Sequence, residues 1–433
     1  MAISRDDILA YHLGGKIGMR ITKPFGTLHD LCMAYTPGVA TPVREIHQHP
    51  ETLGRYTAKN NLVGVVTDGT AILGLGDLGA EASIPVMEGK AVLFKAFADV
   101  DAWPVPLNHC RAGGSNRGPT DPQRVIDHVL ALAPMYGGIN LEDIAAPACF
   151  EIETRLGELL GIPVFHDDQW GTAVITLAAV MNYGQLTQRD LSELRIVING
   201  AGAAGIRITE MLKGAGARHV TLCDSKGVVH TARTDLSGKK KEHAVDTSAA
   251  TVGEAMRNAH VFIGVSVANC IKPEEVLAMA SFPAVFAMAN PDPEIRPELV
   301  AQAMACKPYV MATGRSDYPN QINNVLGFPF LFRGALDVGA RSIDMDMKFA
   351  ASRALAALAR EPVPEYVKAI YPDQDLTLGP GYIIPKPFDK RLFVEVPCAV
   401  AEAACRSGAS TRPSIEGYRQ ELEQRNAHRR LLD

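Results

Sequence analysis

The sequence predicts an α/β protein whose second half is a doubly wound parallel sheet. Short apolar runs alternate with helical segments from about residue 171 onward, and a glycine-rich turn near residue 200 joins one such run to a helix. The 433 residues are enough for two or three domains. We expect an N-terminal α/β domain over residues 1–160, a second domain that contains the doubly wound sheet over 161–410 and an exposed, charged C-terminal helix over 411–433.

The N-terminal half begins with short elements. Four prolines interrupt residues 21–50, so helices there must be brief. Residues 61–69 (NLVGVVTDG) predict a strand that runs into a turn, and the apolar run 91–100 (AVLFKAFADV) predicts a second strand. A surface loop rich in Gly and Pro over 109–122 then leads to a helix over 122–134, where apolar residues recur at helical spacing.

The C-terminal half alternates more regularly. Residues 171–184 predict a helix of small residues, and residues 193–227 predict a strand, a glycine turn, a helix and a strand in succession. Three further strands are predicted within 259–266, 284–291 and 307–314. This alternation is typical of a parallel sheet with helical crossovers.

Composition excludes several classes of function. The net charge of −5 gives no electrostatic reason to expect nucleic acid or an anionic membrane as a partner, and no apolar run approaches the ~18 residues of a membrane span. The N-terminus carries Asp6 and Asp7 where an export signal needs an apolar core, and the eight cysteines include no CxxC pair. We therefore expect a cytoplasmic protein with reduced thiols.

The glycine turn has the spacing of a dinucleotide-binding motif. Gly200, Gly202 and Gly205 follow an apolar run and open a helix, and Asp224 ends the next predicted strand. The helix N-terminus attracts phosphate, and the acid can bind a ribose hydroxyl. GLGDLG (74–79) has the same spacing but lacks an acid at the end of a second strand, so we interpret it as a structural turn.

Two acidic pairs follow apolar runs, Glu142–Asp143 and Asp167–Asp168. Carboxylates suit a hard divalent ion such as Mg²⁺ or Mn²⁺, and two or three of them with open positions make a catalytic site. Each pair can equally be a helix N-cap with acids in its first turn. The residues alone leave both interpretations open.

A series of motifs carries a resemblance to a known family. In order they are AYTPGVA, GLGDLG, VMEGK, GGINLEDI, VFHDDQWGTA, GAGAAG, CDSKG, ANPDPEI and TGRSDYPNQINNVLGFPFLFRGALDVGA. From about residue 20 to 360 the chain resembles malic enzymes of the short bacterial type, without a phosphotransacetylase-like extension. The resemblance implies an N-terminal α/β catalytic domain, a Rossmann-type NAD(P)-binding domain and oxidative decarboxylation of L-malate to pyruvate and CO₂. It also implies a divalent metal, NAD or NADP, and a homodimer or larger homo-oligomer.

The resemblance also implies residue roles. Glu142, Asp143 and Asp168 match the metal ligands, and Asp167 then lies beside the ligands. Lys90 matches the base that removes the hydroxyl proton, with Lys95 as the alternative, and Tyr35 matches the acid that protonates the enolate. A lysine needs a lowered pKa for this task, which burial beside a metal can provide.

Further matches concern the cofactor and the substrate. Asn290 matches a residue beside the nicotinamide, and either Asn323 or Asn324 matches a contact to malate. The cofactor-binding residues are then Gly200, Ala201, Gly202, Ala203, Ala204, Gly205, Asp224, Ser225 and Asn290. Asp224 favours NAD, whereas Ser225, Lys226 and Lys239–Lys241 favour the 2′-phosphate of NADP, and we lean slightly to NADP.

The chain departs from the family pattern at three places. Ala71 replaces an arginine that some members use for a malate carboxylate, Trp170 replaces the usual histidine of HDDQHGT, and residues 101–121 look unlike the family. Two alternative functions stay open. One is a malolactic-type conversion of malate to lactate with bound NAD, and the other is an inactive dinucleotide-binding regulator.

Overall fold

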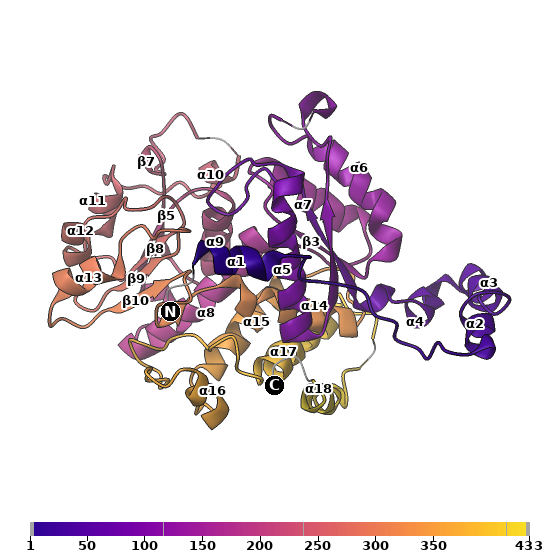
Figure 1. The fold of residues 1–433 in the computed structure, drawn as a ribbon. Coiled ribbons are helices and arrows are strands. Elements are labelled where there is room, and N and C mark those ends of the chain that lie inside the picture. The colour runs from indigo at the N-terminus through magenta and orange to yellow at the C-terminus, as the bar shows by residue number, and fades with distance from the viewer. Residues whose placement is uncertain (1–3, 116, 237, 413, 430–433) are drawn as a thin grey trace.

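The computed structural model describes residues 4–115, 117–236, 238–412 and 414–429. In this part of the chain, two sheets of mainly parallel strands are surrounded by helices (Figure 1). The predicted α/β class is therefore confirmed. The division of the chain at residues 160 and 410 stays a prediction.

The first sheet has the strand order β2-β1-β3-β4, and all its strands are parallel. Its strands are β1 (Leu62–Thr67), β2 (Asp101–Pro106), β3 (Gly138–Leu141) and β4 (Val164–His166). Its helices are α5 (Ala80–Ala98), α6 (Pro122–Leu132) and α7 (Ala148–Leu159). Because β3 and β4 are paired and parallel, the segments that follow them leave the sheet at the same edge.

The second sheet has the order β11-β10-β9-β8-β5-β6-β7, and only β7 is antiparallel to its neighbour. Its strands are β5 (Arg195–Asn199), β6 (His219–Asp224), β7 (Gly227–Val228), β8 (Val261–Gly264), β9 (Ala284–Ala287), β10 (Val310–Thr313) and β11 (Asn320–Gln321). The order in which strands are added to the sheet changes direction between β5 and β8, which are neighbours. Doubly wound sheets bind their ligands at such a position.

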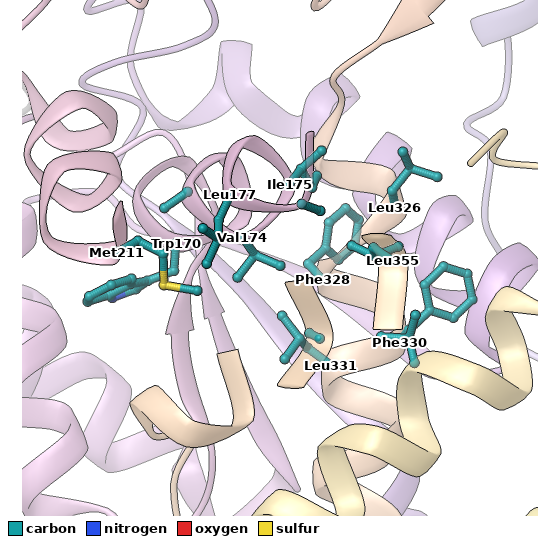
Figure 2. Packing of buried hydrophobic residues seen from close by; sticks show 14 of the residues in the cluster. Trp170, Val174, Ile175, Leu177, Met211, Leu326, Phe328, Phe330, Leu331 and Leu355 are labelled. Atoms are coloured by element: carbon teal, nitrogen blue, oxygen red, sulfur yellow. The ribbon is translucent and has the colours of Figure 1, made fainter. Parts of the chain in front are cut away.

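A large apolar core joins the two sheets. Helix α15 packs against α17 and α8, and α14 packs against α17 and α5. Figure 2 shows Phe328 and Leu331 of α14 close to Val174 of α8 within this cluster. The helices of this half are α8 (Thr172–Thr187), α9 (Ala203–Gly214), α10 (Gly238–Glu242), α11 (Val252–Met256), α12 (Pro273–Leu277), α13 (Pro297–Met304), α14 (Phe328–Asp337), α15 (Met345–Leu358), α16 (Glu365–Ile370), α17 (Leu392–Ser407) and α18 (Tyr418–Ala427).

The N-terminal segment adds no buried residue to this core. It contains α1 (Arg5–His12), α2 (Leu28–Ala34), α3 (Ala40–Gln48) and α4 (Leu53–Tyr56). None of residues 4–61 is buried, and α2 and α3 extend away from the body of the molecule (Figure 1). We call residues 13–56 the N-terminal arm.

The structure corrects three sequence-based predictions. The strand predicted over 91–100 is instead the last part of α5, which ends at Ala98, because a continuous apolar run suits a helix covered on several sides as well as a buried strand. The 109–122 loop is not wholly on the surface, since Arg111 is buried. The terminal helix is anchored rather than exposed, because α18 buries Tyr418 and Leu422.

Two further expectations concern the cysteines and membrane-spanning segments. All eight cysteines are free, and four of them are buried. Among the described residues, no helix combines the length and the apolar character needed to cross a membrane.

Candidate functional site

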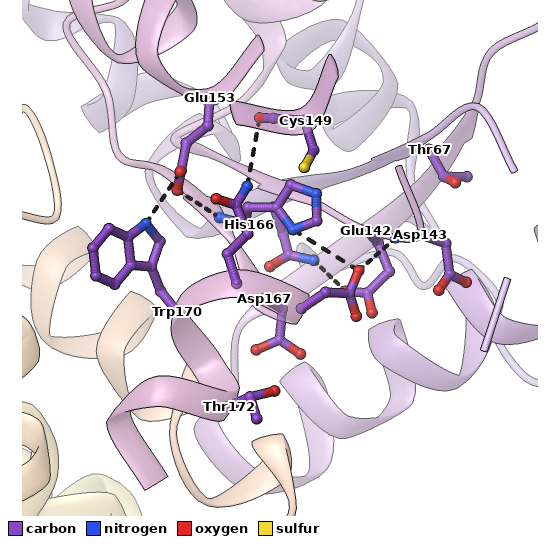
Figure 3. Close-up of polar contacts among 12 residues, drawn as sticks. Thr67, Glu142, Asp143, Cys149, Glu153, His166, Asp167, Trp170 and Thr172 are labelled. Atoms are coloured by element: carbon purple, nitrogen blue, oxygen red, sulfur yellow. Dashed lines mark hydrogen bonds and ion pairs between the residues drawn. The ribbon is translucent and has the colours of Figure 1, made fainter. Parts of the chain in front are cut away.

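The two acidic pairs meet where β3 and β4 end. Glu142 and Asp143 follow β3, and Asp168 lies in the wide helical turn Asp167–Gly171 after β4. One carboxylate oxygen from each of Glu142, Asp143 and Asp168 lies within 4.8 Å of the others. The backbone N–H of Asp143 donates to Oδ2 of Asp168 at 2.8 Å, and Figure 3 shows Glu142, Asp143 and Asp167 in the same region of the structure. We call Glu142, Asp143 and Asp168 the carboxylate cluster.

The donor set of the cluster fits a hard divalent cation. All three residues offer oxygen, which Mg²⁺ and Mn²⁺ prefer. Oδ2 of Asp143 is buried and has no hydrogen-bond partner within the described structure, so it is available to a ligand. Asp143 is held rigidly, because its carbonyl accepts from the N–H of Ala71 at 2.9 Å and its Oδ1 from the N–H of Leu73 at 3.2 Å. Ala71 therefore supports the cluster through its backbone.

Burial dominates the electrostatics of these carboxyl groups. It raises the pKa of Asp143 to about 7, with Asp168 adding to the effect. Burial likewise raises the pKa of Glu142 well above its usual value and raises the pKa of Asp168. A buried carboxyl group that resists ionisation becomes ionised readily when a cation is supplied.

Lys90 reaches the cluster from α5. Its Nζ lies 3.0 Å from Oε1 of Glu142 and forms an ion pair with Asp167, and it lies 4.6 Å from the centre of the Phe328 ring. Burial by itself would lower the pKa of Lys90, but the neighbouring carboxylates raise it above its usual value. Without a cation in the cluster this amine is therefore charged. Lys95 instead pairs with Asp99 and Asp101.

Asp167 is enclosed on a second side. Nδ2 of Asn324 donates to its Oδ2 at 3.0 Å, and Thr172 donates to Oδ1 of Asn324 at 3.0 Å. A Cβ atom at Gly171 would lie 1.9 Å from Oδ1 of Asp167, so only glycine fits there. Asn323 instead accepts from the N–H of Val325 and caps the following turn. Of the two candidate asparagines, Asn324 is the one beside Asp167.

The predicted phosphate cradle has the expected backbone form. Gly200 has a φ of 121°, and a Cβ atom at Gly205 would lie 1.7 Å from the carbonyl oxygen of Gly200. Gly202 faces open space, and its N–H and those of Ala203 and Ala204 begin α9 with no side-chain cap. Uncapped N–H groups at a helix N-terminus attract phosphate.

Asp224 at the end of β6 is bound by cations. Arg233 forms a bidentate pair with it, at 2.8 Å and 3.0 Å, and Nζ of Lys240 lies 3.4 Å from its Oδ2. Burial raises the pKa of Asp224, but the hydrogen bonds and charge of Arg233 outweigh burial and lower it. Arg233 could not be identified from the sequence, because no known spacing brings a residue nine positions after the end of a strand into contact with the last residue of that strand.

Two predicted residues lie outside the carboxylate cluster. Asn290 is exposed just beyond β9, and the peptide bond to Pro291 is cis. Tyr35 lies at the C-terminal end of α2 in the N-terminal arm and is 69% exposed. Over the residues that the structure describes, no hydrogen bond or ion pair joins it to the carboxylate cluster. The structure does not bring Tyr35 to Lys90 within one chain.

Two protein-family models match the chain. One is described as "Malic enzyme, N-terminal domain" and matches residues 15–157, and the other is described as "Malic enzyme, NAD binding domain" and matches residues 170–376. The first contains β1–β3 and Lys90, and the second contains the glycine turn and β5–β11. Glu142 and Asp143 of the carboxylate cluster lie within the first match, and Asp168 lies in the short segment between the two matches.

Individual proteins give the same result. The chain is 50% identical to the NADP-dependent malic enzyme of Halomonas elongata, over 96% of each chain. It is 48% identical to the NADP-dependent malic enzyme of Rhizobium meliloti (strain 1021), over 98% of this chain, but it spans only 55% of that protein's length. A crystal structure of malic enzyme from Pyrococcus horikoshii superposes with a TM-score of 0.85 at 38% identity, covering 99% of this chain and 95% of that one.

Proposed function

This chain belongs to the malic enzyme family, and we propose that it converts L-malate to pyruvate and CO₂ with reduction of NADP⁺ or NAD⁺. The observation that carries this proposal is the position of Lys90. Its amine lies 3.0 Å from Glu142, in a cluster whose three carboxylates are close enough to share one cation. A potential base and a potential metal site therefore adjoin the same small space, as oxidation of a hydroxy acid requires.

We propose that Glu142, Asp143 and Asp168 hold Mg²⁺ or Mn²⁺. When bound, the ion would withdraw electrons from the malate oxygens, and the nicotinamide would accept the hydride from C2. The unpartnered Oδ2 of Asp143 supports this assignment. Asp167 is not one of the three residues of the cluster, and its contacts to Lys90 and Asn324 suit a role in orienting the amine.

Lys90 is the proposed base for the C2 hydroxyl proton. In the cation-free cluster the carboxylates raise its pKa, so the amine holds its proton. Positive charge placed among the same carboxylates favours loss of that proton. Asp167 and Asn324 orient the amine and retain it in the site. Lys95 is less suited to this role, because its partners Asp99 and Asp101 lie at the far end of α5.

We propose that NADP is the preferred dinucleotide. The pair formed by Arg233 and Asp224 supports this, because an arginine that neutralises the acid removes its repulsion of a 2′-phosphate. Lys240 adds a second cation at the same carboxylate. Asn290, Ser225 and the backbone of residues 200–205 remain proposed contacts to the dinucleotide.

We propose that the active form is a homodimer or a larger homo-oligomer. The N-terminal arm exposes Met19 (91%), Leu28 (76%) and Ile21 (75%), more apolar surface than a free segment normally shows to water. A second copy of the chain covering this arm would bury that surface. It would also allow Tyr35 to act as the acid in the partner's site, since Tyr35 does not reach Lys90 within its own chain.

A spectrophotometric assay tests the proposed function. Purified protein with L-malate and Mn²⁺ should produce reduced nicotinamide, faster with NADP⁺ than with NAD⁺, together with pyruvate. Activity should need Mn²⁺, and Asp168→Ala should lose Mn²⁺-dependent turnover while Glu151→Gln, a change on the exposed face of α7, should retain it. Lactate without net reduction of NAD⁺ would indicate the malolactic reaction instead. Binding of dinucleotide without any product would indicate a regulator.

A further inference from the structure

Trp170 lies at the meeting point of four elements. It belongs to the Asp167–Gly171 turn, and it is only 6% exposed. Its indole N–H donates to Oε2 of Glu153 on α7 at 3.1 Å. Oε1 of the same carboxylate accepts from the backbone N–H of His166 at 3.2 Å, so Glu153 holds both ends of the segment that carries Asp167 and Asp168 (Figure 3).

Two buried cations lie close to the Trp170 ring. Nζ of Lys348 on α15 is 3.7 Å from the ring centre, and the guanidinium carbon of Arg207 on α9 is 4.5 Å from it. Both residues are 7% exposed. The attraction between a cation and an indole is stronger when water is excluded, so these contacts favour one arrangement of the turn.

Arg207 connects the turn that carries Trp170 to α9, the helix that begins at the glycine cradle. It donates to Oε1 of Gln169 at 2.8 Å, to Glu153 at 3.1 Å and to Glu210 at 2.7 Å. Arg207 lies one helical turn after Ala203, where α9 begins at the glycine cradle. Glu210 in turn pairs with Lys239 at 3.3 Å, next to the Lys240 that contacts Asp224. Polar contacts therefore link the turn that carries Asp168 to Arg207, Glu210 and Lys239. The backbone of α9 continues this link to the glycine cradle, and the residue after Lys239 contacts Asp224.

We propose that Trp170 is a positioning residue that couples the carboxylate cluster to the dinucleotide cradle, so that Mg²⁺ in the cluster and NADP⁺ on α9 raise each other's affinity. This inference rests on the proposed function, because it assumes that both ligands bind. A shift of the Asp168 carboxylate on binding a cation moves the turn, and the turn moves against Arg207 because buried aromatic and ionic contacts leave no free space. Linkage requires the effect to be equal in both directions.

A purely structural role for Trp170 makes a different prediction. If the indole only fills space, its replacement lowers stability and lowers affinity for each ligand without changing how one ligand affects the other. The coupling factor, the ratio of NADP⁺ dissociation constants without and with saturating Mg²⁺, separates the two cases.

The test is titration calorimetry of the full chain with Mg²⁺ alone, NADP⁺ alone and each in the presence of the other. We expect a coupling factor of about five or more in the unmodified protein, equal in both directions. In Trp170→Phe, which keeps a ring but loses the N–H and much of the cation contact, the factor should fall to about one to two. Lys348→Met should lower it similarly. Arg353→Met, five residues along α15 and over Phe349, is the matched control and should leave the factor unchanged.

Fluorescence gives an independent readout. The chain has two tryptophans, and Trp103 in β2 is 43% exposed, so Trp103→Phe leaves Trp170 as the only emitter. We expect its emission to change both with Mg²⁺, which does not quench fluorescence by itself, and with NADP⁺.

The results separate the inference from the function on which it rests. If both ligands bind the unmodified protein but without coupling, or with a coupling that Trp170→Phe and Lys348→Met leave intact, the inference is wrong and the proposed function stands. Trp170 emission that responds to neither bound ligand contradicts it as well, even if both variants fail to fold. If neither Mg²⁺ nor NADP⁺ binds at all, the proposed function is wrong and the inference fails with it.

Discussion

Gly74 lies directly against the backbone of Asn290: a Cβ atom at Gly74 would be 2.1 Å from the Asn290 carbonyl oxygen. Gly74 belongs to the turn between β1 and α5, next to Leu73, whose N–H donates to Asp143. Asn290 follows β9 of the second sheet. At Gly74, therefore, the backbone of the part of the chain that supports the carboxylate cluster lies directly against the predicted dinucleotide side.

Replacing Gly74 with alanine should separate these two parts. The added methyl group cannot be accommodated against backbone, so the turn or the Asn290 segment must move by more than an ångström. We expect kcat to fall about tenfold or more while the melting temperature changes little, because the turn is at the surface. Steady-state kinetics and thermal unfolding measure the two effects. Gly157→Ala in α7, where a methyl group meets nothing within 4 Å, should leave kcat unchanged.

The role of Lys90 can be compared with that of Lys95 on the same helix. Lys90→Ala removes the proposed base and should lower kcat by about 10²–10⁴-fold. Lys95→Ala removes only a lysine paired with Asp99 and Asp101, so its kcat should stay near that of the unmodified protein. Ammonium or a small primary amine in the buffer should restore part of the activity of Lys90→Ala. Full activity of Lys90→Ala, or loss in Lys95→Ala alone, would transfer the role to Lys95.

The choice of dinucleotide should depend on Arg233. In Arg233→Ala the Asp224 carboxylate loses its bidentate partner and repels a 2′-phosphate, whereas it can still accept a hydrogen bond from a 2′-hydroxyl. We expect KM for NADP⁺ to rise about tenfold or more, with KM for NAD⁺ unchanged or lower. The ratio of kcat/KM for the two cofactors is the measurement. Arg218→Ala, an exposed change just before β6, should leave the ratio as it is, and an equal change for both cofactors in Arg233→Ala would contradict the assignment.

The sequence predicted the candidate site best where its residues adjoin strand ends. Glu142, Asp143 and Asp168 follow apolar runs that pair as β3 and β4, and the shared edge of parallel strands brought them together. The glycine cradle is local in the same sense, because Gly200 and Gly205 touch within one turn. Local spacing made both features candidates, but for the acidic pairs only the family resemblance favoured metal ligands over helix caps.

Contacts between distant segments could not be predicted in this way. Arg111, in the loop that the sequence left unexplained, donates to Asp68 and Asp77 and so anchors the turn that supports Asp143. Lys348 reaches Trp170 from far along the chain. Such pairs have no periodicity or fixed spacing, and they form only because packing places the helices side by side. For the same reason the motif made Tyr35 a candidate acid but could not predict where Tyr35 lies relative to Lys90.

A buried histidine away from the carboxylate cluster should make stability depend on pH. Nδ1 of His260 accepts from the backbone N–H of Arg195 at 3.0 Å, and burial, with Arg195 and Arg189, lowers the pKa of His260 to about 4. Between pH 6.5 and 4 the unfolded chain binds a proton that the folded chain does not, so stability decreases as the pH falls through this window. We expect this one group to contribute at most about 2 kcal/mol to the loss between pH 7 and 5.

Urea unfolding at the two pH values measures that loss. His260→Gln should show a smaller decrease in unfolding free energy than the unmodified protein, whereas His219→Gln, an exposed change in β6, should show the same decrease. An identical pH dependence in His260→Gln and the unmodified protein would show that other groups carry the effect.

Subunit complementation can establish whether Tyr35 acts within its own chain or in a partner. Tyr35→Phe and Lys90→Ala should each be inactive alone. If the arm of one copy supplies Tyr35 to the other, a mixed dimer contains one site with both Tyr35 and Lys90 intact. Refolding the two variants together in equal amounts should then recover about a quarter of the normal activity, because half of the dimers are mixed and each has one working site.

If Tyr35 serves its own chain, every site in the mixture carries one defect and no activity returns. Mixing Tyr35→Phe with the double variant that carries both changes is the matched control, and it should stay inactive in either case. Sedimentation of each mixture confirms that dimers have formed, so that an absence of recovery can be attributed to the arrangement of the site. Exposed Met19 and Leu28 in the arm favour recovery, because a partner that covers them also brings Tyr35 against its own surface.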